Sequence, residues 1–321
     1  MRALLPALLL GLAPGLAAAQ SLRQDLRDVA RAGAIGGALH GFSVFGGVPG
    51  ISAATYDSEG VHLDSSKVPI SNTFAAFDSG WLAGTAPYLE FTAGYLHARV
   101  NGVVAEPDLG ATDARLTSDA FTGLAGVGLD IPVLAALGGR TVLRPILLAG
   151  YARIDSNTRF SGPNATSLAQ RTQGLITDAS LDSLLLGGAI ALVHDRALGG
   201  GIDLQVGLRF NQLADIGLQA TDPALNTTNG FSVTTAAVEL KGPTGLDIGG
   251  LPLRWIGFAA GTWMFGQGSD ALGFSSFAEL GAGLELGTTG HLPWVQAISL
   301  RGSGLFGDNV TGWSVGLAMS F

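Results

Sequence analysis

The chain has 321 residues, of which 47% are hydrophobic and 13% are charged, and it contains 49 glycines. Charged residues make up about 25% of an average soluble domain, so this composition indicates a membrane protein. The formal net charge of −8 disfavours nucleic-acid binding, which needs a basic surface, so we expect no nucleic-acid partner. The lack of cysteine excludes disulfides, cysteine-based zinc sites and cysteine nucleophiles.

The first residues have the features of a secretory signal peptide. Arg2 supplies a positive charge, residues 3–16 form an apolar run, and Ala17-Ala18-Ala19 fits the small-residue cleavage pattern. A membrane anchor is the alternative, but the apolar run is short for a spanning helix and two prolines interrupt it. We therefore expect a signal peptide over 1–19 and export from the cytoplasm.

Residues 20–48 predict a short helix and a linker. Ser21 and Gln24 have the spacing of a capping box, and the apolar residues that follow share one side of a helix. The sequence therefore predicts a helix over about 21–32 and a Gly-rich linker through Gly46-Gly47. This segment is expected to plug the fold that follows, to lie at its periplasmic mouth, or to remain a flexible leader.

From residue 49 onward, large apolar and small or polar residues alternate with the period of two that is typical of β-strands. In 202–211, large apolar residues from Ile202 to Phe210 alternate with polar or small ones from Asp203 to Asn211. Residues 313–321 alternate in the same way and end on Phe321. Strands are expected at 49–59, 66–77, 85–100, 114–130, 140–155, 183–195, 201–213, 230–241, 251–266, 274–287, 294–306 and 311–321.

These segments predict an all-β fold, a transmembrane antiparallel β-barrel of about 12 strands over 49–321 with a short N-terminal helical segment. No convincing spanning helix follows the signal peptide, and a closed barrel is the other way to satisfy the backbone inside a membrane. An even number of strands returns both barrel ends to the periplasmic side. The polar connections 156–182 and 214–229 are expected outside, and the short ones 196–200 and 288–293 on the periplasmic side.

Three features resemble a known family. The terminal Phe321 on an alternating strand resembles the signal that the barrel assembly machinery of Gram-negative bacteria reads. The segments Pro49-Gly-Ile-Ser-Ala-Ala-Thr-Tyr56 and Pro87-Tyr-Leu-Glu-Phe-Thr-Ala-Gly-Tyr-Leu96 are similar to the solitary autotransporter barrels, which lack an attached passenger. The resemblance covers most of 40–321 and implies an outer-membrane barrel. The 29 or so residues between the cleavage site and the first strand leave no room for a passenger domain, so the resemblance does not imply self-secretion.

A catalytic role is not expected. Gly312-Trp313-Ser314-Val315-Gly316 matches the Gly-x-Ser-x-Gly motif of serine hydrolases, but the motif works on a strand–turn–helix elbow, and here it lies within the last predicted strand. The nearest histidine in sequence, His291, belongs to a connection on the opposite rim. The sets His62-Leu63-Asp64-Ser65-Ser66, expected in an external loop, and His194-Asp195-Arg196 fit ordinary polar loops or rims better than an active site.

No metal or cofactor is expected either. Asp215 and Asp222 could bind calcium loosely, although solvated loop carboxylates explain them better. The run Gly199-Gly200-Gly201 lacks the lysine of a phosphate-binding loop and fits a tight turn.

The most informative polar residues are six charges that we expect to face the lumen. A structural interpretation pairs them across the lumen as an ion-pair lattice that closes the interior, and a functional one makes them pore-lining groups. They are Glu90, Asp203, Arg209, Glu279, Glu285 and Arg301.

The expected location is the outer membrane, with membrane lipid and the barrel assembly machinery as partners and an extracellular partner left open. The favoured hypothesis is a structural or surface-interaction barrel of the solitary autotransporter type. A narrow porin-like channel for small solutes is the alternative, and an outer-membrane enzyme is the weakest hypothesis.

Overall fold

The structure is a computed structural model that describes residues 21–31, 34–45, 51–58, 60–106, 110–133, 138–265, 272, 274–288 and 295–320. The predicted signal peptide over 1–19, His291 and the assembly signal Phe321 lie outside the described residues.

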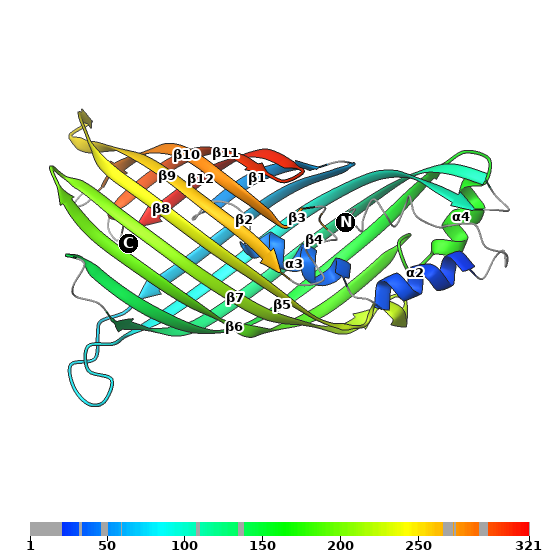
Figure 1. Ribbon diagram of the computed structural model, residues 1–321, viewed down its shortest axis with the longest axis horizontal. Helices are drawn as coiled ribbons and strands as arrows, with labels where there is room; N and C mark the ends of the chain where they lie inside the picture. The colour runs from blue at the N-terminus through cyan, green and yellow to red at the C-terminus, as the bar shows by residue number, and fades with distance from the viewer. Residues whose placement is uncertain are drawn as a thin grey trace.

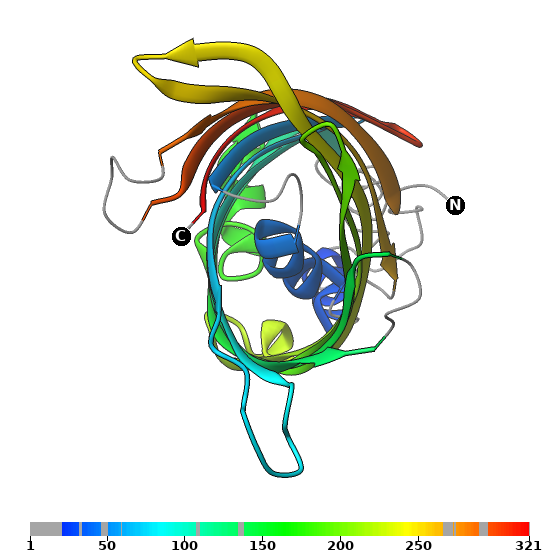
Figure 2. The same cartoon turned by 90° about the vertical axis from the view of Figure 1, so that its left-hand side faces the viewer.

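Twelve antiparallel strands form one closed barrel in which each strand pairs with its neighbours in sequence and β1 pairs with β12 (Figures 1 and 2). The predicted all-β fold and its strand count are therefore confirmed. The strands are β1 (Ile51–Ser58), β2 (Val61–Thr73), β3 (Ala86–Glu106), β4 (Gly110–Pro132), β5 (Arg140–Ser161), β6 (Ala179–Gly199), β7 (Ile202–Ala220), β8 (Thr228–Ile248), β9 (Leu251–Phe265), β10 (Ser276–Gly287), β11 (Ala297–Gly307) and β12 (Val310–Ser320).

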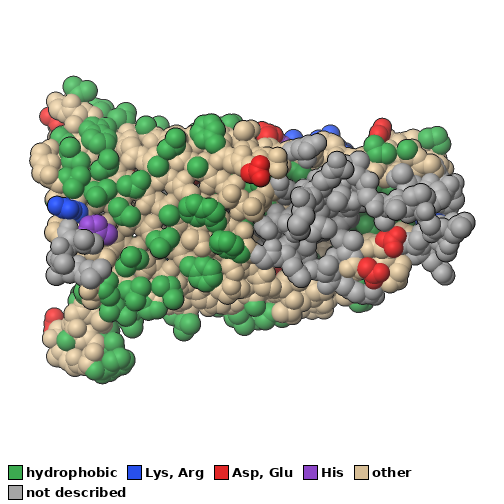
Figure 3. Space-filling model, in the orientation of Figure 1, with side chains coloured by type: hydrophobic (Ala, Val, Ile, Leu, Met, Phe, Trp, Pro, Cys, Tyr) green, Lys and Arg blue, Asp and Glu red, His purple; other side chains and the backbone are tan. Residues whose placement is uncertain are grey.

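The alternating pattern sorts side chains to the two faces of the wall, because successive residues of a strand point to opposite sides. On β7 the side chain of Leu208 is 49% exposed on the outer face, whereas Asn211 is 1% exposed inside. On β12, Trp313 and Val315 are exposed and Ser314 is buried. Large hydrophobic side chains are spread over the outer wall (Figure 3).

The wall is taller on one side. Strands β3 to β8 have 19 to 23 residues, whereas the other six have 8 to 15. A tilted strand that crosses a bilayer needs about 9–11 residues, so β3 to β8 are about twice that length. The ends of the predicted loops 156–182 and 214–229 belong to these strands, and the real connections are 162–178 and 221–227. Residues 156–161 carry a single large apolar side chain, Phe160, so the period of two gave no signal there.

The two ends of the barrel differ. At one end, which we call the terminal rim, β1 begins and β12 ends, and the connections include the ordered hairpin loop 74–85 and the turn at Gly249-Gly250. At the other end, the helical rim, the connections carry α4 (Ala165–Thr172) and the short 3-10 helix η1 (Pro223–Leu225).

Within the described residues, two helices precede the barrel. Helix α2 (Ser21–Arg31) confirms the predicted helix, and its buried residues Leu22 and Leu26 lie one turn apart. The predicted Gly-rich linker was wrong over Ala34–Phe45, which is helix α3. Burial inside the barrel accounts for this helix, because tertiary packing routinely overrides the low helix propensity of glycine. Within the described residues, no helix is both long and apolar enough to cross a membrane.

The hydrophobic core lies inside the barrel. Helix α3 contacts the walls formed by β2 to β5 and by β7 and β8, and it touches α2. The view along the barrel shows the helices within the ring of strands (Figure 2). The buried apolar cluster joins both N-terminal helices to side chains from the wall, so the helices are part of the packed interior.

Candidate functional site: the filled lumen

Aromatic rings fix α3 against the wall. The ring of Phe42 meets Tyr56 of β1 edge-on, with centroids 4.7 Å apart. The same ring meets Phe274 at 5.6 Å and Phe277 at 6.2 Å. All four side chains are buried, and such pairs add about 0.5–1.5 kcal/mol each beyond the area they bury. This cluster therefore joins the helix to β1 and to the start of β10.

Two glycines allow the close approach of helix and wall. A Cβ atom on Gly41 would lie 1.7 Å from Cζ of Phe231, so the ring of β8 occupies the space that a side chain would need. On the wall, a Cβ on Gly94 would lie 2.2 Å from the carbonyl oxygen of Ser43. The glycines that suggested a flexible linker thus include one that the packed helix requires.

Buried polar contacts accompany this packing. His40 Nδ1 lies 2.7 Å from Asp215 Oδ2 on β7, and the two side chains are 0% and 3% exposed. The Ser43 hydroxyl donates to the His40 carbonyl oxygen at 2.6 Å, and the Thr122 hydroxyl lies 2.9 Å away. Although Ser43, His40 and Asp215 are residue types of a hydrolase triad, the Ser43 hydroxyl is bonded to the His40 backbone, and His40 Nε2 has no hydrogen-bond partner among the described residues. Sequence reasoning missed the pair because 175 residues separate its members.

Helix α2 is held at the helical rim by one carboxylate. Asp222 accepts hydrogen bonds from Arg23 Nη2 at 2.9 Å and from Arg27 Nη2 at 3.0 Å, and its side chain is 4% exposed. The same carboxylate accepts from the Ala224 amide and thereby caps η1. Arg23 also donates to the carbonyl oxygen of Gln173, which follows α4. We call Arg23, Arg27 and Asp222 the Asp222 cluster.

The cluster changes the acidity of its carboxyl group. Burial alone would raise the pKa of Asp222. The Arg27 hydrogen bond, the Ala224 amide and the charges of both arginines outweigh burial and hold the pKa below its usual value of 3.8. Asp222 was considered at most a loose calcium ligand from sequence, but the structure engages it with two arginines.

Of the six charges expected in the lumen, Glu90 and Arg209 form one pair. Arg209 donates to both oxygens of Glu90, at 2.6 and 2.8 Å, in the bidentate geometry that favours arginine–carboxylate pairs. Tyr88 also donates to Glu90, at 2.8 Å. Since β3 and β7 are separated by three other strands, this pair bridges walls that are not neighbours.

Asp203, Glu285 and Arg301 belong to a chain of ion pairs along β7 to β11. Its links are Asp203–Arg254 at 2.6 Å, Arg254–Glu285 at 3.6 Å, Glu285–Lys241 at 2.7 Å, Lys241–Glu239 at 3.3 Å and Glu239–Arg301 at 2.5 Å. The sixth residue, Glu279, accepts from the hydroxyls of Ser303 and Ser314. Each carboxylate in the chain thus has a cationic partner. Glu239 and Glu285 are largely buried and need one, whereas Asp203 is 55% exposed near the terminal rim.

Sequence reasoning missed three members of this chain. Glu239 and Lys241 lie on β8, whose pattern alternates poorly, and Arg254 lies near the start of β9. Glu239 and Lys241 are two residues apart and therefore point to the same side of β8, and this spacing was the signal that the sequence offered.

The structure also pairs Arg144 with Asp130 at 2.5 Å, with the guanidinium 3.8 Å from the Tyr88 ring centre.

A cavity of about 720 Å³ remains in the barrel interior between α3 and the terminal rim. Its lining includes Val44 from α3 and Glu90, Arg209 and Arg301 from the wall. The apolar packing around α3 therefore occupies one part of the lumen and the charged groups line the other.

The Gly-x-Ser-x-Gly serine does not have hydrolase geometry. Ser314 is buried within β12, and its hydroxyl bonds Glu279 and Ser303. Within the residues that the structure describes, no group of three His, Asp or Glu side chains is placed to hold a metal ion.

The outer face changes from apolar to polar toward the helical rim. Tyr95 and Tyr151 donate to Asp119 and Asp182, and His97 Nδ1 lies 2.7 Å from Asp119. The predicted external loop at 62–66 was wrong, because these residues belong to β2. There the inward side chains of Val61 and Leu63 are buried, while His62 and Asp64 face out with Asp57 and Arg99.

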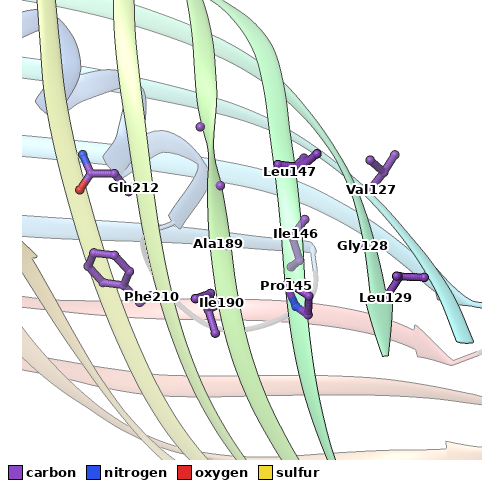
Figure 4. Close-up of a pocket in the computed structure, with 12 residues that line it drawn as sticks. Val127, Gly128, Leu129, Pro145, Ile146, Leu147, Ala189, Ile190, Phe210 and Gln212 are labelled. Carbon is purple, nitrogen blue, oxygen red and sulfur yellow. The ribbon is translucent and has the colours of Figure 1, made fainter. Parts of the chain in front are cut away.

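A groove of about 690 Å³ marks the outer wall over β4 to β7 (Figure 4). It is lined by apolar residues such as Leu147 and Phe210 and by Gly188, with Gln212 at its edge. Pro145 also lines it, at the point where the β4–β5 pairing is interrupted between Gly128–Ile146 and Ile131–Leu143. Proline has no amide hydrogen to donate, which explains the interruption.

No family model and no curated protein matches the sequence. Solved structures do match, at low identity. The β-domain of the Bordetella autotransporter BrkA matches with 14% identity and a TM-score of 0.45, over 84% of this chain and 97% of that one. The transport unit of AIDA-I from Escherichia coli matches with 13% identity and a TM-score of 0.47, over 84% and 89%. The translocator domain of NalP from Neisseria meningitidis matches with 13% identity and a TM-score of 0.42, over 84% and 86%.

Proposed function

We propose that the protein is an outer-membrane β-barrel of the autotransporter translocator type in a Gram-negative bacterium. Its lumen is closed by its own N-terminal helices, and its role is structural or directed at a partner on the cell surface. Membrane lipid and the barrel assembly machinery are its proposed partners.

The outer wall supports a membrane location. Leucine, phenylalanine and valine side chains are exposed around the barrel, and such a surface would be an aggregation hazard in water. Toward the helical rim, tyrosine hydroxyls reach carboxylates, as expected where an apolar band meets water. In this assignment the helical rim is external and the terminal rim is periplasmic.

The position of the N-terminal helices is the main support for the proposal that the lumen is closed. Helix α2 is bound at the helical rim through the Asp222 cluster, α3 is packed inside the lumen, and β1 begins at the terminal rim. The two helices therefore lie between the helical rim and the barrel interior, while the wall begins at the opposite rim. A barrel whose purpose is the passage of solutes would not need this obstruction.

Single cysteines test this arrangement, because the chain has none of its own. In the matched variants Asp25→Cys on α2 and Asp247→Cys at the terminal rim, both positions are exposed. We expect a membrane-impermeant maleimide to label Asp25→Cys on intact cells and Asp247→Cys only after the outer membrane is permeabilised. Labelling of Asp247→Cys alone on intact cells would contradict the assignment.

A narrow channel for small solutes is the second candidate, and the cavity of about 720 Å³ is the observation that favours it. That function requires α3 to leave the lumen or to leave a path beside it. Steady ion conductance by the full chain would favour the channel over the closed barrel.

A further inference from the structure

Two hairpins at the terminal rim project outward from the barrel wall. The loop 74–85 between β2 and β3 and the end of the β8–β9 hairpin extend away from the barrel in both views, on different sides of it (Figures 1 and 2). Neither lies over the mouth of the barrel, so neither is placed to gate the lumen.

The loop 74–85 is ordered by its own backbone hydrogen bonds. The Phe77 amide donates to the Thr85 carbonyl oxygen at 2.8 Å, and the Gly84 amide returns to Phe77 at 2.9 Å. Gly80 and Gly84 adopt φ angles of 84° and 82°, which favour glycine. A hairpin with this much internal bonding holds its tip in a defined position.

The loop exposes large aromatic side chains. Trp81 is 92% exposed, and Phe74 and Phe77 are also exposed. Figure 3 shows hydrophobic side chains on the part of the molecule that projects from the terminal rim. Exposed aromatic residues on an ordered hairpin are costly in water, which indicates that another phase or partner covers them.

The end of the β8–β9 hairpin also exposes apolar side chains, although none of them is aromatic. A register shift between Pro243 and Asp247 bends it, as bulges do, and Gly249-Gly250 forms its turn. Leu246 and Ile248 beyond the shift are exposed. Two separate hairpins thus place apolar side chains outside the wall at one rim.

We propose that these hairpins lie in the membrane–water interface and anchor the terminal rim to the adjacent lipid leaflet. The inference rests on the proposed membrane barrel, because the hairpins continue its apolar outer face sideways. Tryptophan favours the headgroup region, where its ring is buried and its N–H stays hydrated.

The charges of the hairpins specify the lipid contact. Residues 74–85 contain one ionisable side chain, Asp78, and residues 244–251 contain one, Asp247. With no lysine or arginine in either segment, the contact is apolar and not an electrostatic attachment to anionic headgroups. High salt should therefore leave it unchanged.

Fluorescence of single-tryptophan chains tests the anchor. The chain has five tryptophans, and replacing Trp255, Trp263, Trp294 and Trp313 by phenylalanine leaves Trp81 alone. A matched chain keeps only Trp313, which faces outward on the wall. Both are refolded at full length into phosphatidylcholine vesicles, with or without lipid brominated near the headgroup or near the chain end.

We expect both tryptophans to emit at blue-shifted wavelengths and to lose intensity with brominated lipid. Trp81 should be quenched more by bromine near the headgroup than by bromine near the chain end. A Leu246→Trp substitution in a chain whose five tryptophans are all phenylalanine should behave as Trp81 does.

The possible results distinguish a failure of the proposed lipid anchor from a failure of the proposed membrane barrel. Water-like emission from Trp81, with Trp313 quenched, would overturn the anchor and leave the membrane barrel intact; a periplasmic protein partner for the hairpin would give this result. If neither tryptophan were quenched in refolded protein, the membrane barrel itself would be wrong.

Discussion

At the scale of single residues, the structure depends on a few contacts between the N-terminal helices and the barrel. Asp222 binds α2 through two arginines, His40 meets Asp215, and Gly41 leaves room for Phe231. Each contact joins residues far apart in sequence. None is visible in local alternation, capping or spacing, which are the signals that the sequence offers.

Asp222 makes the docking of α2 dependent on pH. Its pKa is lower in the folded state than in the unfolded chain, where a carboxyl titrates near 3.9, so its stabilisation is fully present above that value. The stabilisation is lost as the pH falls through the folded pKa. We expect hydrogen exchange of 21–31 to be independent of pH between about 5 and 7, after correction for the intrinsic rate, and to accelerate below about 4.

The variant Asp222→Asn provides the control. It removes hydrogen bonds to a charged group, which contribute about 1.5–3 kcal/mol in other proteins, so exchange of 21–31 should be faster at neutral pH. It should also lose its acceleration below about pH 4, because no carboxyl titrates there. An acid response identical to that of the parent would show that another group controls the helix.

A substitution at Gly41 tests how closely α3 packs against Phe231 of β8. Alanine at this position would place its Cβ 1.7 Å from Phe231, so we expect Gly41→Ala to lower the free energy of unfolding by roughly 1–3 kcal/mol. The matched variant Gly123→Ala has no heavy atom within 4 Å of the added Cβ and should change stability by less than about 0.5 kcal/mol. Denaturant unfolding measures both, and equal stabilities would mean that α3 is not packed as described.

At the scale of elements, strands in the apolar band were predictable and helix α3 was not. The period of two placed Leu208 outside and Asn211 inside β7, because lipid and lumen demand different side chains. The same rule failed for the end of β5 at the helical rim, because residues 156–161 carry only one large apolar side chain, Phe160. The prediction also failed at 34–45, where the glycines indicated a linker but packing against the barrel wall stabilises helix α3.

Charged substitutions on β7 test which of its side chains face lipid. Arginine at Leu208 would face lipid, so Leu208→Arg should cost roughly 2–4 kcal/mol if the position lies near the bilayer midplane. Leu218→Arg, on the same strand but close to the helical rim, should cost no more than about 1 kcal/mol. Both residues are exposed in the structure, so exposure alone does not distinguish them. Similar costs would place the membrane band elsewhere on the barrel.

Among the polar side chains, sequence alone could propose inward charges but not their partners. Glu90 and Arg209 were both expected inside, yet their bidentate pairing across the barrel requires the closed topology. Lys241 and Glu239 were missed because the pattern of β8 is weak. The chain of pairs from Asp203 to Arg301 satisfies each carboxylate, which favours the structural interpretation of these charges over the pore-lining one.

At the scale of the whole molecule, we propose a barrel closed by its own N-terminal helices. Planar-bilayer recording of the refolded full chain and of a variant that lacks residues 20–46 tests whether the helices close it. We expect no steady open steps from the full chain and reproducible steps from the variant. Steady steps of the same size from both proteins would show that the helices do not close the lumen.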